Sequence, residues 1–181
     1  MNLGFDFDKI FIDYPPFIPD AVIDRLYKKR ASGKLSYRIP SKPEQIFRRF
    51  THHPLLRPPI EENIKTIKKL VQNKQHKHYL ISSRFDFLKN ATQHLIKKHQ
   101  FDNVFDGVFF NFENEQPHLF KDKIVKKLHI HRYVDDDLRL LEFLISKNPT
   151  IICFWLNKTY KGLLKRNLFG ITKLSSILDN I

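Results

Sequence analysis

Short apolar segments alternate with amphipathic segments along most of this 181-residue chain. The apolar segments are rich in β-branched and aromatic residues, which favours strands. Between them, apolar residues recur at three- and four-residue spacing, which is typical of helices. This alternation predicts βαβ units and a parallel sheet covered on both faces. The expected strands are 3–7, 78–82, 104–112 (as one or two pieces), 132–135 and 150–156, and the expected helices are 60–71, 85–99, 122–128 and 138–146.

Polar side chains stand at the ends of three of these expected strands. Asp6 and Asp8 lie at the carboxyl end of the first strand, Ser82 ends the second, and Asp135 and Asp136 lie at the end of the fourth. The carboxyl ends of parallel strands meet at one edge of an open α/β sheet, so we expect these side chains to lie together there. Acids at the end of a buried strand need compensation, which a metal ion or a lysine can supply.

Composition narrows the class of protein. Hydrophobic residues make up 41% of the chain, which is enough for a packed core and excludes overall disorder. The formal net charge of +13 favours an anionic partner, such as a phosphorylated metabolite or nucleic acid. The one cysteine, Cys153, lies in an apolar run and is interpreted as a core residue. No secretory leader and no bilayer-spanning apolar run is visible, so we expect a cytoplasmic protein without membrane association.

Residues 14–57 depart from the alternation. The segment is rich in proline, and its lysines and arginines far outnumber its acids. Amphipathic pieces around 18–28 and 44–50 predict helices. We interpret the segment as a small basic helical cap inserted over the strand ends, with 1–13 and 58–181 as the core domain. The cap either positions a polyanionic substrate or carries an ordinary solvated basic face, and the sequence leaves both open.

The polar residues at the strand ends match the needs of phosphoryl transfer through an aspartyl-phosphate. That reaction uses a carboxylate nucleophile and a second carboxylate that gives and takes protons. It also uses Mg²⁺ held by oxygen ligands, and groups that hold the phosphoryl oxygens. The chain offers Asp6 and Asp8, then Ser82, then Lys121, and finally the acids at 135–136.

This order of motifs resembles the haloacid dehalogenase (HAD) superfamily of phosphohydrolases. The motifs read F-D-F-D-K-I-F-I-D, Y-L-I-S-S-R, F-K-D-K-I-V-K-K-L and R-Y-V-D-D-D-L, and they bracket residues 3–140. The resemblance implies a HAD-like Rossmannoid α/β fold, a parallel sheet flanked by helices, with a small helical cap after the first strand. The chain departs from the pattern at Lys9, where glycine is usual, at Ile10, where Thr or Val is usual, and at Leu140, where many members carry an acid.

The resemblance also implies a role for each catalytic residue. Asp6 would be the nucleophile and a metal ligand, and Asp8 the general acid/base, with its backbone carbonyl on the metal. Ser82 would hydrogen-bond the phosphoryl group. Lys121 would neutralise charge between the nucleophile and the phosphate, with Lys123 as the competing candidate.

Further residues are expected to hold the metal and the substrate. By the same resemblance, Asp136 is the principal Mg²⁺ ligand of the fourth motif, with Asp135 beside it. Ser83, Arg84 and Lys9 are expected to contact the substrate.

By the resemblance, an acid at position 8 implies phosphatase or phosphomutase chemistry, and phosphatases are the commoner case. We therefore expect a Mg²⁺-dependent phosphatase that acts on a phosphorylated small molecule, with nucleotides among the candidates. The positive charge keeps a second hypothesis open, a nucleic-acid end phosphatase or another metal-dependent enzyme that binds nucleic acid. The substitutions at Lys9 and Leu140 keep a third open, a HAD-fold binding module with little or no turnover.

Overall fold

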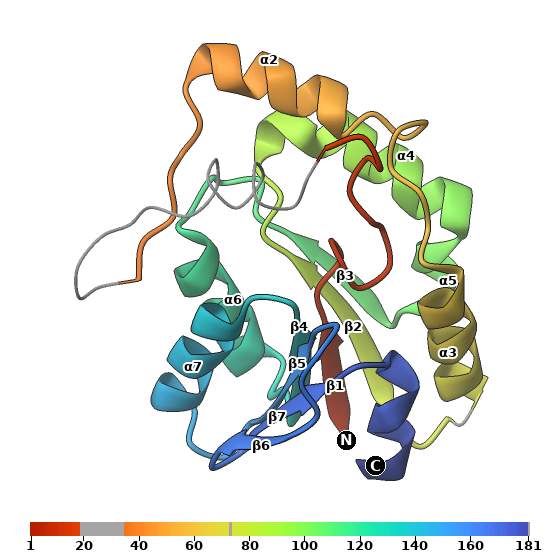
Figure 1. The fold of residues 1–181 in the computed structure, drawn as a ribbon, viewed down its shortest axis with the longest axis vertical. Coiled ribbons are helices and arrows are strands. Elements are labelled where there is room, and N and C mark those ends of the chain that lie inside the picture. Colours follow the sequence, from red (N-terminus) through yellow and green to blue (C-terminus); the bar gives the residue numbers. More distant parts are fainter. Residues whose placement is uncertain (19–34, 73, 181) are drawn as a thin grey trace.

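The computed structural model describes residues 1–18, 35–72 and 74–180. Its centre is a seven-stranded sheet in the order β3-β2-β1-β4-β5-β7-β6 (Figure 1). Neighbouring strands run parallel except for the β6–β7 pair. The strands are β1 (Asn2–Phe5), β2 (Lys77–Ser82), β3 (Gly107–Phe110), β4 (Arg132–Asp135), β5 (Ile152–Leu156), β6 (Gly162–Lys165) and β7 (Leu168–Ile171).

Helices cover both faces of the sheet, as the alternation predicts (Figure 1). One face packs against α3 (Glu61–Gln72), α4 (Lys89–His99), α5 (Phe101–Val104) and the 3₁₀ helix η2 (Leu174–Asn180). The other face packs against α6 (Pro117–Lys127) and α7 (Leu138–Lys147). The 3₁₀ helix η1 (Asp86–Leu88) precedes α4, and α2 (Lys42–Thr51) lies beyond the carboxyl ends of the strands.

The expected strands and helices are confirmed, with shifted ends. The helix expected at 122–128 begins earlier, at Pro117, where proline is tolerated in the first turn. Val104 ends α5 and so does not belong to a strand. The β6–β7 hairpin and η2 were not predicted. Leu163 in β6 is 61% exposed, so its apolar pattern does not mark a buried strand.

Strand β1 lies in the middle of the sheet and brings Asp6 to its carboxyl edge. Leu3 and Phe5 are buried, and the backbone N–H of Asp6 donates to the carbonyl of Val134 (2.9 Å), which continues the pairing with β4. The next turn is also packed, because Phe7 and the apolar residues at 10–12 are buried against α3 and α5. The position of Asp6 is thus fixed by the pairing of β1 with β4 before it and by the packed turn after it.

The structure describes part of the segment predicted to form the cap. The helix expected at 44–50 lies within α2, whereas the helix expected around 18–28 falls almost wholly outside the described residues. Tyr37 ties the segment to the core, because its backbone N–H and carbonyl pair with the side-chain amide of Gln116 (2.9 and 3.2 Å). The division into core and cap stays a prediction. In the ranges that the structure covers, no helix has the length and apolar character to cross a bilayer.

Gly4 allows a close approach inside the sheet, and its replacement by alanine tests this packing. A Cβ at position 4 would lie 2.6 Å from Cδ2 of Tyr133, a fully buried ring whose hydroxyl donates to the carbonyl of Ile81. We expect Gly4→Ala to lower the free energy of unfolding by about 1–3 kcal/mol in denaturant titrations. Gly107→Ala is the control, because its nearest contact is the half-buried Phe109 at 3.0 Å and it should cost less. Equal stability of Gly4→Ala and wild type would contradict the packing argument.

Candidate active site

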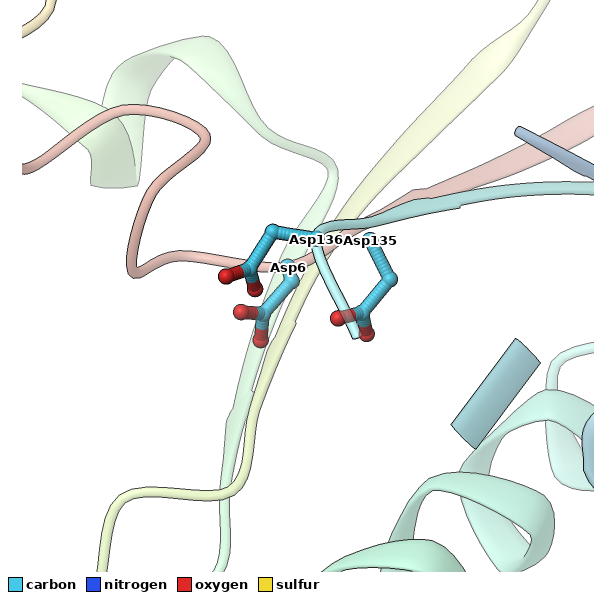
Figure 2. A group of neighbouring side chains, drawn as sticks. All are labelled: Asp6, Asp135 and Asp136. Carbon is cyan, nitrogen blue, oxygen red and sulfur yellow. The ribbon is translucent and has the colours of Figure 1, made fainter. Parts of the chain in front are cut away.

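Three carboxylates meet at the carboxyl ends of β1 and β4. Phe5 is in register with Val134, which places Asp6 beside Asp135 and Asp136 (Figure 2). One oxygen from each acid lies within 4.8 Å of the others. Clustered carboxylate oxygens are the ligands that Mg²⁺ and Ca²⁺ prefer. The group can therefore hold a divalent cation.

Lys121 bridges two of these acids from the side of α6. Its Nζ donates to Oδ1 of Asp6 (2.8 Å) and to Oδ2 of Asp135 (2.6 Å), and the side chain is buried. Lys123, two residues later, is exposed and instead contacts Glu115 (2.5 Å). Of the two candidate lysines, it is Lys121 that lies next to the proposed nucleophile.

The charges in this group do not balance. Burial and the neighbouring acids outweigh Lys121 and raise the pKa of Asp6 to about 7. Burial and the charges of Asp135 and Asp6 raise the pKa of Asp136 well above its usual range. Burial lowers the pKa of Lys121, but the two acids outweigh burial and raise it, so the ammonium group stays charged. The raised pKa values mean that these acids retain protons near neutral pH, and a bound divalent cation would displace those protons and stabilise the ionised carboxylates.

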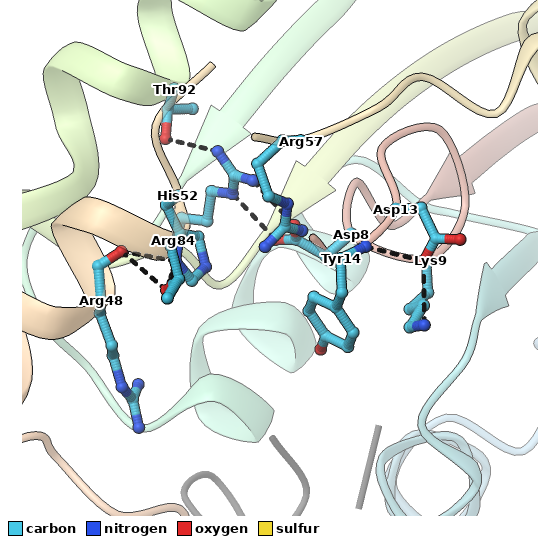
Figure 3. Close-up of polar contacts among 10 residues, drawn as sticks. Asp8, Lys9, Asp13, Tyr14, Arg48, His52, Arg57, Arg84 and Thr92 are labelled. Carbon is cyan, nitrogen blue, oxygen red and sulfur yellow. Dashed lines mark hydrogen bonds and ion pairs between the residues drawn. The ribbon is translucent and has the colours of Figure 1, made fainter. Parts of the chain in front are cut away.

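Asp8 lies in a different electrostatic environment. Arg84 donates to both of its oxygens (2.8 and 2.7 Å), and Arg57 donates to Oδ1 (Figure 3). Burial alone would raise the pKa of Asp8, but the two guanidinium groups outweigh it and hold the pKa below its usual range. Asp8 is therefore held as a carboxylate, apart from the acids grouped around Lys121.

Arg57 was not recognised as a site residue from the sequence. It is 1% exposed and comes from the segment that leads back from α2 to α3. Its guanidinium carbon also lies 4.8 Å from the ring centre of Tyr14, at the start of the outgoing segment. No motif marks this arginine, which stands among many basic residues. The proline pair that follows it is the one local signal of a constrained backbone.

The backbone conformation at Lys9 explains why the superfamily pattern has glycine at this position. Its φ is 62°, in the left-handed region where glycine carries no steric cost, so the usual glycine at this position has a backbone reason. Its Nζ contacts Asp13 (2.9 Å) and lies 4.4 Å from the ring centre of Tyr14. The ammonium group thus faces the turn after β1, and the expected substrate contact of Lys9 stays a prediction.

The acids open into a cavity of about 150 Å³ at the carboxyl edge of the sheet. Ser82, Ser83 and Arg84 line it from the end of β2, so three residues predicted to contact the phosphate or the substrate lie beside the acids. Leu140 lines it where many family members carry an acid. The predicted catalytic and metal-binding residues are thus brought together, although their roles stay predictions.

Residues of the inserted segment line the same cavity. Arg48 and His52 reach it from α2, and Tyr37 donates its hydroxyl to Asp137 (2.7 Å). Burial and the charges of Arg57 and Arg84 lower the pKa of His52 well below its usual range, so it stays neutral. Sequence reasoning assigned the segment to the site as a whole but named none of these residues, because they belong to no motif.

Comparisons with known proteins place the fold. No protein-family model and no curated protein matches the sequence. A haloacid dehalogenase-like family hydrolase from Xanthomonas campestris has a similar structure, with a TM-score of 0.64 and 11% identity over 99% of this chain and 95% of that one. A haloacid dehalogenase-like family hydrolase from Streptococcus pneumoniae gives 0.63 and 10% over 99% and 98%. A HAD-superfamily hydrolase from Ehrlichia chaffeensis gives 0.58 and 12% over 99% and 94%.

These similarities define the class of fold. The chain has the HAD-like α/β fold that the motif order implied. At 10 to 12% identity the likeness concerns the fold, so activity has to be argued from the site itself.

The strained backbone at Lys9 can be separated from its contacts by two substitutions. Lys9→Ala removes the contacts with Asp13 and Tyr14 but keeps a side chain at positive φ. Lys9→Gly removes the same contacts and also the steric cost, which is about 1–2 kcal/mol. We expect Lys9→Gly to be the more stable variant by about 1 kcal/mol in denaturant titrations. A less stable Gly variant would show that the turn tolerates Lys9 without strain.

Proposed function

We propose that the chain is a divalent-metal-dependent phosphomonoester hydrolase that works through an aspartyl-phosphate on Asp6. The observation that carries the proposal is a group of three acids that line a cavity, the buried Asp6 and Asp135, bridged by Lys121, and the half-buried Asp136 beside them. A protein that only needed a stable core would gain little from two buried carboxylates, a third at their side and one ammonium group. The fold of HAD-superfamily hydrolases agrees with this reaction class.

The reaction would proceed in two displacements. An Asp6 oxygen forms a bond to phosphorus as the ester P–O bond breaks, and the leaving oxygen takes a proton from Asp8. Water then attacks the phosphorus and gives a proton back to Asp8, and the bond from phosphorus to Asp6 breaks to release phosphate. Lys121 keeps Asp6 oriented, and the Ser82 hydroxyl lies on the cavity wall where it can donate to a phosphoryl oxygen.

The contacts of Asp8 bear on its two roles. Its ionised form, stabilised by Arg84 and Arg57, suits the step in which it removes a proton from water. The first step needs a protonated Asp8, so at least one arginine contact has to loosen when substrate binds.

The residues fit a divalent ion. One carboxylate oxygen of Asp136 lies within 4.8 Å of an oxygen of Asp6 and of Asp135. The negative charges of these two acids contribute to the raised pKa of Asp136, and a bound cation would offset them. A bound Mg²⁺ would supply positive charge to the nucleophile and to the phosphoryl oxygens. Asp6, Asp135 and Asp136 would hold it.

Substitution of the nucleophile tests the proposal. A screen of phosphorylated metabolites and p-nitrophenyl phosphate with Mg²⁺ should find substrates for wild type, and Asp6→Asn should lower phosphate release by about 10³-fold or more. Asp102→Asn is the control, because Asp102 is exposed on α5, and it should retain the wild-type rate.

Beryllofluoride provides a direct measurement of the same residue. It should form an adduct with wild type and with Asp102→Asn, seen by ¹⁹F NMR, and none with Asp6→Asn. Equal turnover by wild type and Asp6→Asn would remove the assignment. Absence of turnover on every substrate, together with no adduct, would favour a binding module.

Stability measurements test the metal site through its charge. The folded-state pKa of Asp136 is above its unfolded value, so this group stabilises the fold at low pH and loses that contribution as pH rises through the folded pKa. Buried histidines such as His52 act in the opposite direction, so variants are compared at one pH. Without metal, Asp136→Asn should have a higher thermal midpoint than wild type at about pH 8.5, and a smaller advantage at about pH 5.5.

Mg²⁺ should reverse that order. The ion binds ionised carboxylates, so it should raise the wild-type midpoint more at about pH 8.5 than at about pH 5.5. At 100 times its Kd, stabilisation of wild type would be about 2.7 kcal/mol. Asp136→Asn should gain much less. An equal gain for both proteins would place the ion elsewhere.

A further inference from the structure

Helix α2 buries polar residues and exposes apolar ones, which is the opposite of the usual arrangement in a helix that packs on a globular core. Its buried residues are Arg48 and Thr51. Its large apolar residues face outward instead: Ile46 is 68% exposed, Phe47 48% and Phe50 61%. Exposed apolar side chains that gather on one face commonly mark a binding surface.

The same face carries positive charge. Lys42 and Arg49 are exposed on α2 next to these apolar residues, and Arg49 also donates through Nε to the carbonyl of Phe87 (3.3 Å). The one acid in the described residues 35–57 is Glu44, which already contacts Arg38 (2.7 Å). We call Lys42, Ile46, Phe47, Arg49 and Phe50 the outer face of α2. It combines aromatic rings with cations that form no ion pair with an acid among the described residues.

The size of the cavity bears on where the body of a larger substrate would lie. A cavity of about 150 Å³ is comparable to one that holds a single benzene molecule. Its volume suits a phosphoryl group, and the cavity is partly open to solvent. Arg48 of α2 and His52 at the C-cap of the helix line it, so a larger substrate that extends out of the cavity can pass α2.

We propose that the outer face of α2 binds single-stranded nucleic acid and thereby presents its terminal phosphate to the cavity. The inference rests on the proposed phosphatase function and names its substrate class. Bases stack on Phe47 and Phe50, and phosphates contact Lys42 and Arg49. Aromatic platforms with nearby cations are the common means of binding single strands without sequence preference.

The geometry suits a strand better than the other candidate occupants. A helix with its side chains is about 10–12 Å across, and about three nucleotide spacings of 3.4 Å span that width. One strand can thus lie on the outer face and still reach the cavity. In a two-fold dimer through this face, the cations of both copies would meet, which is unfavourable. The net charge of +13 also favours a polyanion.

Binding and turnover by matched variants test the proposal. The probe is a fluorescent single-stranded oligothymidylate of about 12 nucleotides, within the range of known single-strand sites. It carries a 5′-phosphate, a 3′-phosphate or no phosphate. Phe47→Ala/Phe50→Ala should weaken binding roughly 30-fold, seen by anisotropy. Leu163→Ala, with the same exposure as Phe50 but on β6, should bind like wild type.

The salt dependence of oligonucleotide binding tests the contacts of Lys42 and Arg49 with phosphates. Lys42→Gln and Arg49→Gln should each reduce the slope of log K against log salt by about 0.7. In the double phenylalanine variant, phosphate release from the phosphorylated oligonucleotide should fall at least tenfold more than release from p-nitrophenyl phosphate. Circular dichroism would show that the variants are folded.

The outcomes separate this inference from the proposed function. Loss of oligonucleotide binding in the α2 variants, with no phosphate release by wild type from any substrate, would support the binding surface and overturn the phosphatase. If wild type has phosphatase activity but binds no oligonucleotide, the proposed binding surface is overturned and the phosphatase is not. The same holds if the double variant binds the oligonucleotide as well as wild type does. Two other results would also overturn it: α2 variants that alter only sedimentation, or only binding to anionic phosphatidylglycerol vesicles.

Discussion

The contact of Lys121 with Asp6 and Asp135 is the interaction on which the rest of the site depends. Two buried acids at adjacent strand ends would repel each other, and the ammonium group between them makes their proximity tolerable. The lysine comes from α6, on the face of the sheet opposite α3, so the contact also fixes that helix against the strand ends. Because Lys121 is the one cation that contacts these acids among the described residues, a further positive charge would stabilise their ionised forms.

A second and separate charge cluster surrounds Asp8. Two residues apart in sequence, Asp6 and Asp8 have pKa values moved in opposite directions, because one is crowded by acids and the other is held by arginines. Environments that shift the pKa values of two neighbouring carboxyl groups in opposite directions are typical of sites in which the two groups have different chemical roles. The arrangement therefore suits a nucleophile and a proton carrier better than it suits two equivalent metal ligands.

Sequence reasoning recovered the parallel sheet and the meeting point of the strand ends, because both follow from local patterns repeated along the chain. Strand β4 was predicted with its observed bounds, and acids at its end could be placed by topology alone. In the hairpin of β6 and β7, β6 was missed because it is a half-exposed edge strand with little apolar signal, whereas β7 is mostly buried but only four residues long. Arg57 was missed for a different reason: its partner Asp8 is 49 residues away, and one arginine in a basic segment has no periodicity to reveal it.

The position of Arg57 sets a boundary for exchanging parts of the molecule. Both connections of the inserted segment pass Asp8, the outgoing one at Tyr14 and the returning one at Arg57, and these two residues contact each other (Figure 3). The predicted insertion begins at Tyr14 and ends at Arg57, and the contacts of this pair with Lys9 and Asp8 tie both ends to the turn after β1. A chimera that replaced this segment with one from another protein of the same fold would therefore have to be joined inside this pair, between residues 15 and 56.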